Sequence, residues 1–167
     1  MNKLTVFALA LFLAAAAAFA GDTKGISISF SSEDSRTKMG PRHDVRDAKL
    51  AITNRDGSVS LLLMDEVVAI QLTDRALAKV STKDDATFLE ELLASGVRLA
   101  IRKAVEYPIA DIRSVDIRDG ALVLTSDKNQ PVFTEVKVNG TDVLRDFAVG
   151  DAARFVNAFR AAKSGRR

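Results

Sequence analysis

The chain has no cysteine and no tryptophan, and its 167 residues include one histidine, one tyrosine and three prolines. Without cysteine it can form neither a disulfide nor a thiolate metal site, so a packed core must hold the fold together. No glycine-rich phosphate loop occurs, and aromatic platforms for sugars are scarce. These absences predict no cofactor and no metal site.

An excess of one charge is also missing. The 24 Lys and Arg residues nearly balance the 22 Asp and Glu residues. A balanced chain gives no electrostatic argument for nucleic acid or for an anionic membrane. We therefore predict no nucleic-acid partner and do not expect membrane association.

The first twenty residues have the layout of a secretory signal peptide. Lys3 gives a positive start, 4–17 is apolar apart from Thr5, and Ala18-Phe19-Ala20 places small residues at a cleavage site. The alternative is an uncleaved anchor, but the apolar run is short against the ~20 residues that span a bilayer. We predict cleavage after Ala20 and a periplasmic or secreted protein.

Alternation of apolar and polar side chains predicts most of the strands. They are expected at 25–30, 48–53, 58–64, 67–72, 109–117, 121–126 and 132–138. Turn signals lie at 54–57, Asp119-Gly120 and Asn139-Gly140, so the strands should pair as antiparallel hairpins. The polar segment 31–47 contains Gly40-Pro41 and is predicted to be a flexible loop.

Three helices are predicted from caps and from apolar residues at three-and-four spacing. A short one begins at Thr73 or Asp74, a central amphipathic one covers 87–105, and a last one covers 150–163. Tyr107-Pro108 is expected to end the central helix, because proline disfavours helical geometry in the residue before it.

Together these elements predict an α+β domain, with antiparallel sheets, a central amphipathic helix and a C-terminal helix. A single domain is predicted at 48–163. An N-terminal region at 21–47 precedes it and consists of strand 25–30 and the polar loop, and the strand is expected to join the domain. A disordered tail is expected at 164–167.

The hairpin strands at 109–126 and 131–140, followed by the final helix, resemble pleckstrin-homology-like bacterial domains. Several segments, among them 67–80 and 106–115, also look like small bacterial proteins of no assigned activity. The first resemblance implies a pleckstrin-homology-like C-terminal half and raises a lipid-surface role as one hypothesis.

Two residues are candidates for a ligand site, His43 in the polar loop and Tyr107 before Pro108. Asp44 and Asp47 lie near His43, so a small hydrolase using this histidine and its neighbouring carboxylates is an alternative. No serine lies in a G-x-S-x-G turn, however, and a solvated loop histidine is the simpler interpretation. Tyr107 is expected to fix a helix-to-strand corner.

No catalytic residue is therefore predicted. The favoured hypothesis is a non-catalytic exported module of the cell envelope that binds a partner protein or a ligand through a sheet face or edge. The partner is another envelope protein or a second copy of the chain. The hydrolase and the lipid-surface protein remain the alternatives.

Overall fold

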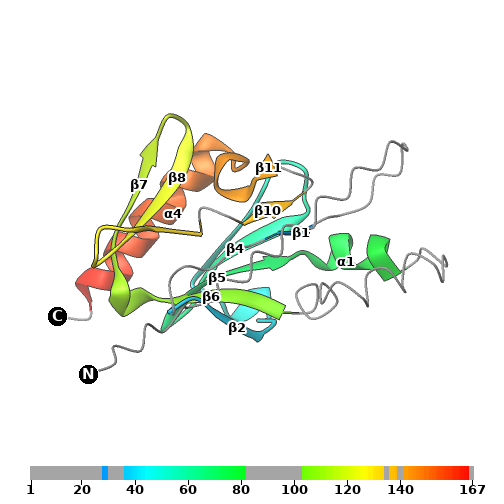
Figure 1. Cartoon of the computed structure of the whole chain (residues 1–167), viewed down its shortest axis with the longest axis horizontal. Coiled ribbons are helices and arrows are strands. Elements are labelled where there is room, and N and C mark those ends of the chain that lie inside the picture. Colours follow the sequence, from blue (N-terminus) through cyan, green and yellow to red (C-terminus); the bar gives the residue numbers. More distant parts are fainter. Residues whose placement is uncertain (1–27, 30–35, 82–102, 134–135, 139–140, 166–167) are drawn as a thin grey trace, which may run out of the picture.

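The computed structural model describes residues 28–29, 36–81, 103–133, 136–138 and 141–165. The predicted signal peptide and most of the predicted central helix lie outside these ranges. The described elements form three antiparallel sheets and two α-helices, which confirms the predicted α+β class with a C-terminal helix (Figure 1).

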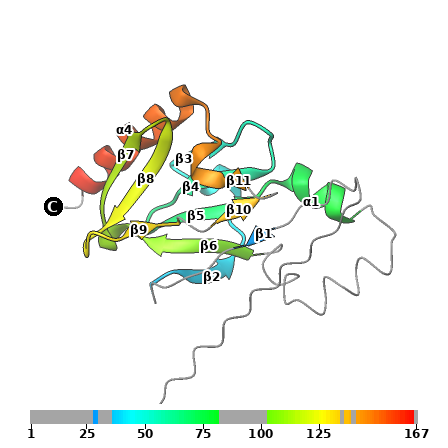
Figure 2. The same ribbon diagram turned by 45° about the horizontal axis from the view of Figure 1, so that its top comes forward.

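The largest sheet has five strands in the order β2-β6-β5-β4-β3 (Figure 2). Their bounds are β2 Lys38–Pro41, β3 Leu50–Thr53, β4 Val59–Leu63, β5 Val67–Leu72 and β6 Lys103–Pro108. The turn between β3 and β4 is the predicted one, with Gly57 at φ 75° and its N–H bonded to the Asn54 carbonyl. Strands β5 and β6 pair although α1 (Asp74–Ser81) and 82–102 separate them in sequence.

A second sheet contains β7 (Ile112–Arg118), β8 (Ala121–Ser126) and β9 (Pro131–Val132). Asp119 and Gly120 both have positive φ in the turn between β7 and β8, which confirms the two-residue hairpin. A third, small sheet joins β1 (Ile28–Ser29), β10 (Lys137–Val138) and β11 (Thr141–Asp142). The predicted strand 132–138 is therefore broken, because Phe133 adopts φ 63° and the chain passes from one sheet to another.

Helix α4 (Val149–Ser164) closes the core, lying along β7 and against β3 and β4 (Figure 1). Its predicted apolar stripe is buried and consists of Ala152, Phe155, Val156 and Phe159. Near its end the Lys163 ammonium donates to the Ile112 carbonyl, which ties the helix to β7. The helix continues to Ser164, the first residue of the predicted tail.

Two predictions about local structure are wrong. Residues 103–105, predicted as helix, belong to strand β6, in which Val105 and Tyr107 face the core and Glu106 faces the other way. Lys38–Pro41, predicted as loop, forms β2, and η1 (Val45–Asp47) is a 3-10 turn. Glycine and proline disfavour strands, so the pairing of β2 with β6 prevails over local preference here.

Candidate functional site

Residues 42–49 cross one face of the five-stranded sheet. Strands β2 and β3 follow one another in sequence but lie at opposite edges of the sheet. The chain between them must therefore pass over β6, β5 and β4, a distance of about four strand spacings or about 19 Å. We call residues 42–49 the crossover segment.

Apart from Leu62, the sheet beneath the crossover segment presents small and polar side chains to it. Ala69, Ala104 and Leu62 form a small buried cluster that also packs Ala48 and Ala51, separate from the main core. Gln71 and Ser60 are paired neighbours on this face, both almost fully buried. Small side chains let the crossover segment approach the sheet closely.

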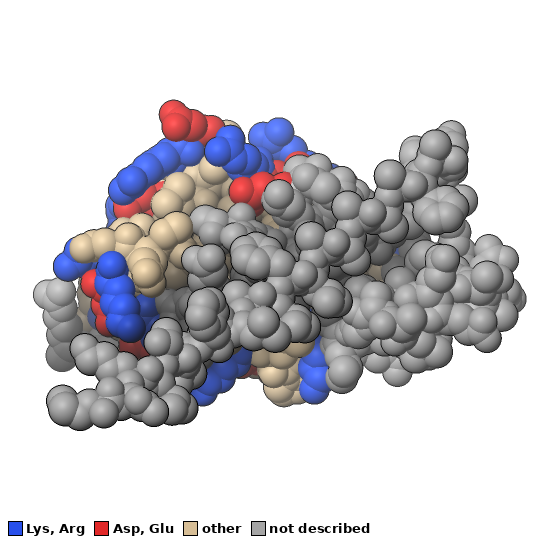
Figure 3. Space-filling view, in the orientation of Figure 1, with Lys and Arg blue, Asp and Glu red and all other residues tan. Residues whose placement is uncertain are grey.

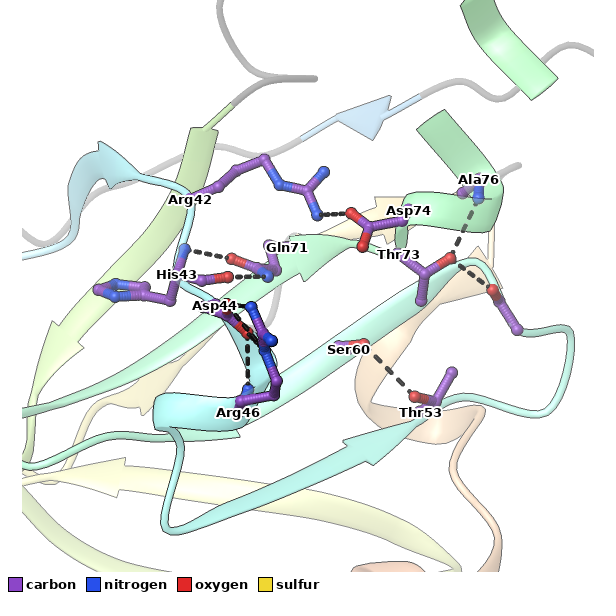
Figure 4. Close-up of polar contacts among 11 residues, drawn as sticks. Arg42, His43, Asp44, Arg46, Thr53, Ser60, Gln71, Thr73, Asp74 and Ala76 are labelled. Atoms are coloured by element: carbon purple, nitrogen blue, oxygen red, sulfur yellow. Dashed lines mark hydrogen bonds and ion pairs between the residues drawn. The ribbon is translucent and has the colours of Figure 1, made fainter. Parts of the chain in front are cut away.

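Gln71 holds the backbone of His43. Its Oε1 accepts from the His43 N–H at 2.9 Å, and its Nε2 donates to the His43 carbonyl at 2.9 Å (Figure 4). One buried amide thus satisfies both backbone groups of a single residue, as a neighbouring strand would. His43 is consequently fixed over β5.

The imidazole of His43 meets the carboxylate of Glu106, from β6. His43 Nε2 and Glu106 Oε1 are 2.9 Å apart, and the two side chains are 22% and 18% exposed. The glycine at position 40 makes room for this contact, because a Cβ built there would overlap the Glu106 carboxylate. Gly40, Glu106 and His43 therefore form one packed polar unit.

An ion pair ties Arg42, at the beginning of the crossover segment, to α1. Arg42 Nη2 donates to Asp74 Oδ1 at 2.7 Å, at the start of α1, whose Ala76 N–H is capped by the Thr73 hydroxyl (Figure 4). Arg42 Nη1 is buried, and it has no hydrogen-bond partner in the described part of the chain.

Asp44 and Arg46 lie at the start of η1. The Asp44 carboxylate accepts from the Arg46 N–H and side chain, and these bonds lower the pKa of Asp44 from 3.8 to about 2. The same carboxylate raises the pKa of Arg46. Asp44 therefore serves to cap η1.

The predicted histidine-centred constellation differs from the observed one. The carboxylate at the ring is Glu106, 63 positions away, whereas Asp44 is engaged by Arg46. The hydroxyls nearby are otherwise occupied: Ser60 bonds Thr53, and Thr73 donates to the Gly57 carbonyl. Across the described ranges no hydroxyl bonds the imidazole, and no three acidic or histidine side chains gather as metal ligands.

Tyr107, the second candidate, lies within β6 and is fully buried. Its ring packs edge-on against Phe133 with centroids 6.3 Å apart, and the Arg36 guanidinium lies over it at 5.3 Å. Arg36 also pairs with Asp127, which lowers the pKa of that carboxyl. Tyr107 thus packs the first sheet against Phe133, which follows β9, and does not fix a helix-to-strand corner.

Where Figure 3 colours described residues, mainly at the upper left, charged side chains of both signs lie next to one another. Several are paired, as in Arg160 with Asp116 on α4 and β7, and Arg154 with Asp151 within α4. The large apolar side chains that are exposed to solvent among the described residues are Met39, Val45, Ile117 and Val149. Met39 belongs to the edge strand β2 and is 41% exposed.

Comparisons with protein-family profiles, with curated proteins and with solved structures each return no match to this chain. In the part that the structure describes, no helix is both long and apolar enough to cross a bilayer.

Proposed function

We propose that the protein is an exported, non-catalytic binding module, released to the periplasm or the medium by cleavage after Ala20. The proposal of a non-catalytic role is supported by the contacts of His43. Its ring contacts Glu106, and its backbone N–H and carbonyl are both bonded by Gln71. These contacts give the histidine a positioning role in the crossover segment.

The binding surface that we propose is the outer edge of β2. Among the described strands β2 has a neighbour on one side only, so its other side offers backbone groups to an extended segment of a partner. Lys38 is exposed on this strand, and the half-exposed Lys103 is opposite Pro41. These cations favour a partner segment with acidic side chains. The partner strand should pair with the part of β2 that precedes Pro41, because Pro41 has no N–H to donate.

The test is capture of envelope proteins on the immobilised mature chain, comparing the wild type with Met39→Glu. A charge at Met39 should repel an acidic segment at the β2 edge, so a specific partner should be lost. Ile117→Glu is the matched control, because Ile117 is similarly exposed on a different sheet. Equal capture by both variants would contradict the β2 edge, and a monomer that captures nothing would remove the support for a binding role.

A small hydrolase is the second candidate, and the contact between Glu106 and His43 favours it. A carboxylate against an imidazole is the arrangement that orients a general base. His43→Gln, assayed with a panel of ester, amide and phosphate substrates, separates the two proposals. Activity that disappears in this variant while the fold is retained would support the hydrolase. If neither protein is active, hydrolysis of the ester, amide and phosphate substrates tested is excluded.

The antiparallel strands β7, β8 and β9, and the position of α4 after β10 and β11 at the end of the chain's described part, support the proposal of a pleckstrin-homology-like C-terminal half. The near balance of 24 basic and 22 acidic side chains does not favour an anionic lipid surface. Flotation with anionic vesicles tests that role directly, and we expect the protein to stay at the bottom of the gradient.

A further inference from the structure

The crossover segment is attached to the sheet mainly by side-chain hydrogen bonds. In η1 no residue is buried, and Val45 is 44% exposed. Backbone bonds of the segment are largely internal, from Asp47 N–H to the Asp44 carbonyl and from Ala48 N–H to the Val45 carbonyl. Two bonds of a single 3-10 turn are too few to keep it folded away from the sheet, so they break when the segment leaves the sheet.

Residues 42–48 make few contacts with the sheet and with α1, and apart from the packing of Ala48 on the apolar cluster these contacts are polar. The polar contacts are the two bonds of Gln71 to His43, the His43–Glu106 contact and the Arg42–Asp74 pair, whose aspartate side chain is 93% exposed. A pair that exposed contributes little. The apolar cluster beneath contains one large side chain, Leu62, beside Ala69 and Ala104.

One side-chain group of the crossover segment is buried at a cost in free energy when the segment lies on the sheet. The buried Nη1 of Arg42 lacks an acceptor within the described residues, and burying a donor without an acceptor costs free energy. Lifting the segment would return this group to water. Regions with few buried apolar contacts are those that open locally before the whole protein unfolds.

We propose that residues 42–48 open away from the sheet as one unit while the five-stranded sheet stays folded, with Gln71 and Glu106 as the two groups that hold the unit closed. Opening would uncover the face formed by Leu62, Ala69 and Ala104. Lys49 stays in place, because its N–H donates to the Leu63 carbonyl of β4 at 2.8 Å. This inference does not rest on the proposed binding role.

Hydrogen exchange of the mature chain, resolved by residue, tests the proposal. The N–H groups of His43, Asp47 and Ala48 should exchange together, and faster than those in the middle of β4 and β5. Gln71→Met removes two hydrogen bonds to His43 and should speed exchange of the three amides by about 5- to 30-fold. The amides of β4 should keep their rates.

A second variant keeps the test valid if Gln71→Met fails to fold. Gly40→Ala leaves His43 and Glu106 in the sequence but pushes the Glu106 carboxylate from its place. It should speed exchange at His43 about fivefold. Gly150→Ala is the matched control, since a Cβ at Gly150 meets nothing within 4 Å. We expect this control to leave the rates of the crossover segment unchanged.

The proposal is overturned if the three amides exchange at the rates of the β4 amides, because the segment then opens only with global unfolding. It is also overturned if Gly40→Ala speeds exchange of β4 as much as that of the crossover segment. A missing partner in capture experiments would leave this result intact, so the two proposals fail separately.

Discussion

The two faces of the five-stranded sheet differ in what covers them. The core face presents large apolar side chains, including Leu61, Ile70 and Tyr107, to α4 and the second sheet. The opposite face presents Ala69, Ala104 and polar residues to the crossover segment. The core face is thus stabilised chiefly by apolar burial, and the crossover face by directional hydrogen bonds.

Tyr107→Ala should give the largest effect and tests the core face. The side chain is fully buried against Phe133 and beneath Arg36, so its truncation leaves a cavity that the sheet cannot fill. We expect the free energy of unfolding to fall by about 3–5 kcal/mol. Urea denaturation measures this change, and a loss below about 1 kcal/mol would contradict the assignment of the core to this face.

Ala69→Leu should give an intermediate effect and tests the crossover face. Ala69 is fully buried in the cluster with Leu62 and Ala104, so a larger side chain must displace the crossover segment. Overpacking of this kind costs about 1–3 kcal/mol. Denaturation combined with exchange at His43 checks the effect. If the crossover face were open to solvent, the substitution would leave both measurements unchanged.

Acidification should give the smallest effect, confined to η1. The folded-state pKa of Asp44 is lowered from 3.8 to about 2, so its contribution to stability is present above pH 4 and is lost as the pH falls towards 2. Carbon NMR of the Asp44 carboxyl should show this low midpoint. In Arg46→Gln the midpoint should move back towards 3.8, and an unchanged midpoint would contradict the pairing.

The sequence predicts the features that follow from local chemistry. Asp119-Gly120 forms a hairpin because both positions need positive φ, and the apolar spacing of Phe155 and Phe159 predicts the buried side of α4. These signals need no knowledge of distant residues. Strand β5, at Val67–Leu72, is predicted with its observed bounds for the same reason.

Strands β2 and β6 were not predicted because tertiary pairing decides them. In 103–108 the alternation of Val105 and Tyr107 with Ala104 and Glu106 marks a strand. The helical spacing of the apolar residues before it masks that pattern. Strand β2 contains Gly40 and Pro41, whose local preference is for loops, and forms by pairing with β6.

The partners of His43 were not predicted either. Gln71 and Glu106 are 28 and 63 positions away from it, on strands that only the sheet order brings beneath the crossover segment. No short motif encodes such a set. The one available signal is the presence of Gln71 and Glu106 within otherwise apolar strands, which indicates that one face of each strand meets a polar partner.

His43 and Glu106 act together to hold the crossover segment on the sheet. A double-mutant cycle with His43→Ala, Glu106→Ala and the double variant, measured by urea denaturation, tests it most directly. We expect the sum of the two single losses of unfolding free energy to exceed the loss in the double variant by about 0.5–3 kcal/mol. Strictly additive losses would show that the two side chains do not stabilise the fold through each other and would contradict the claim.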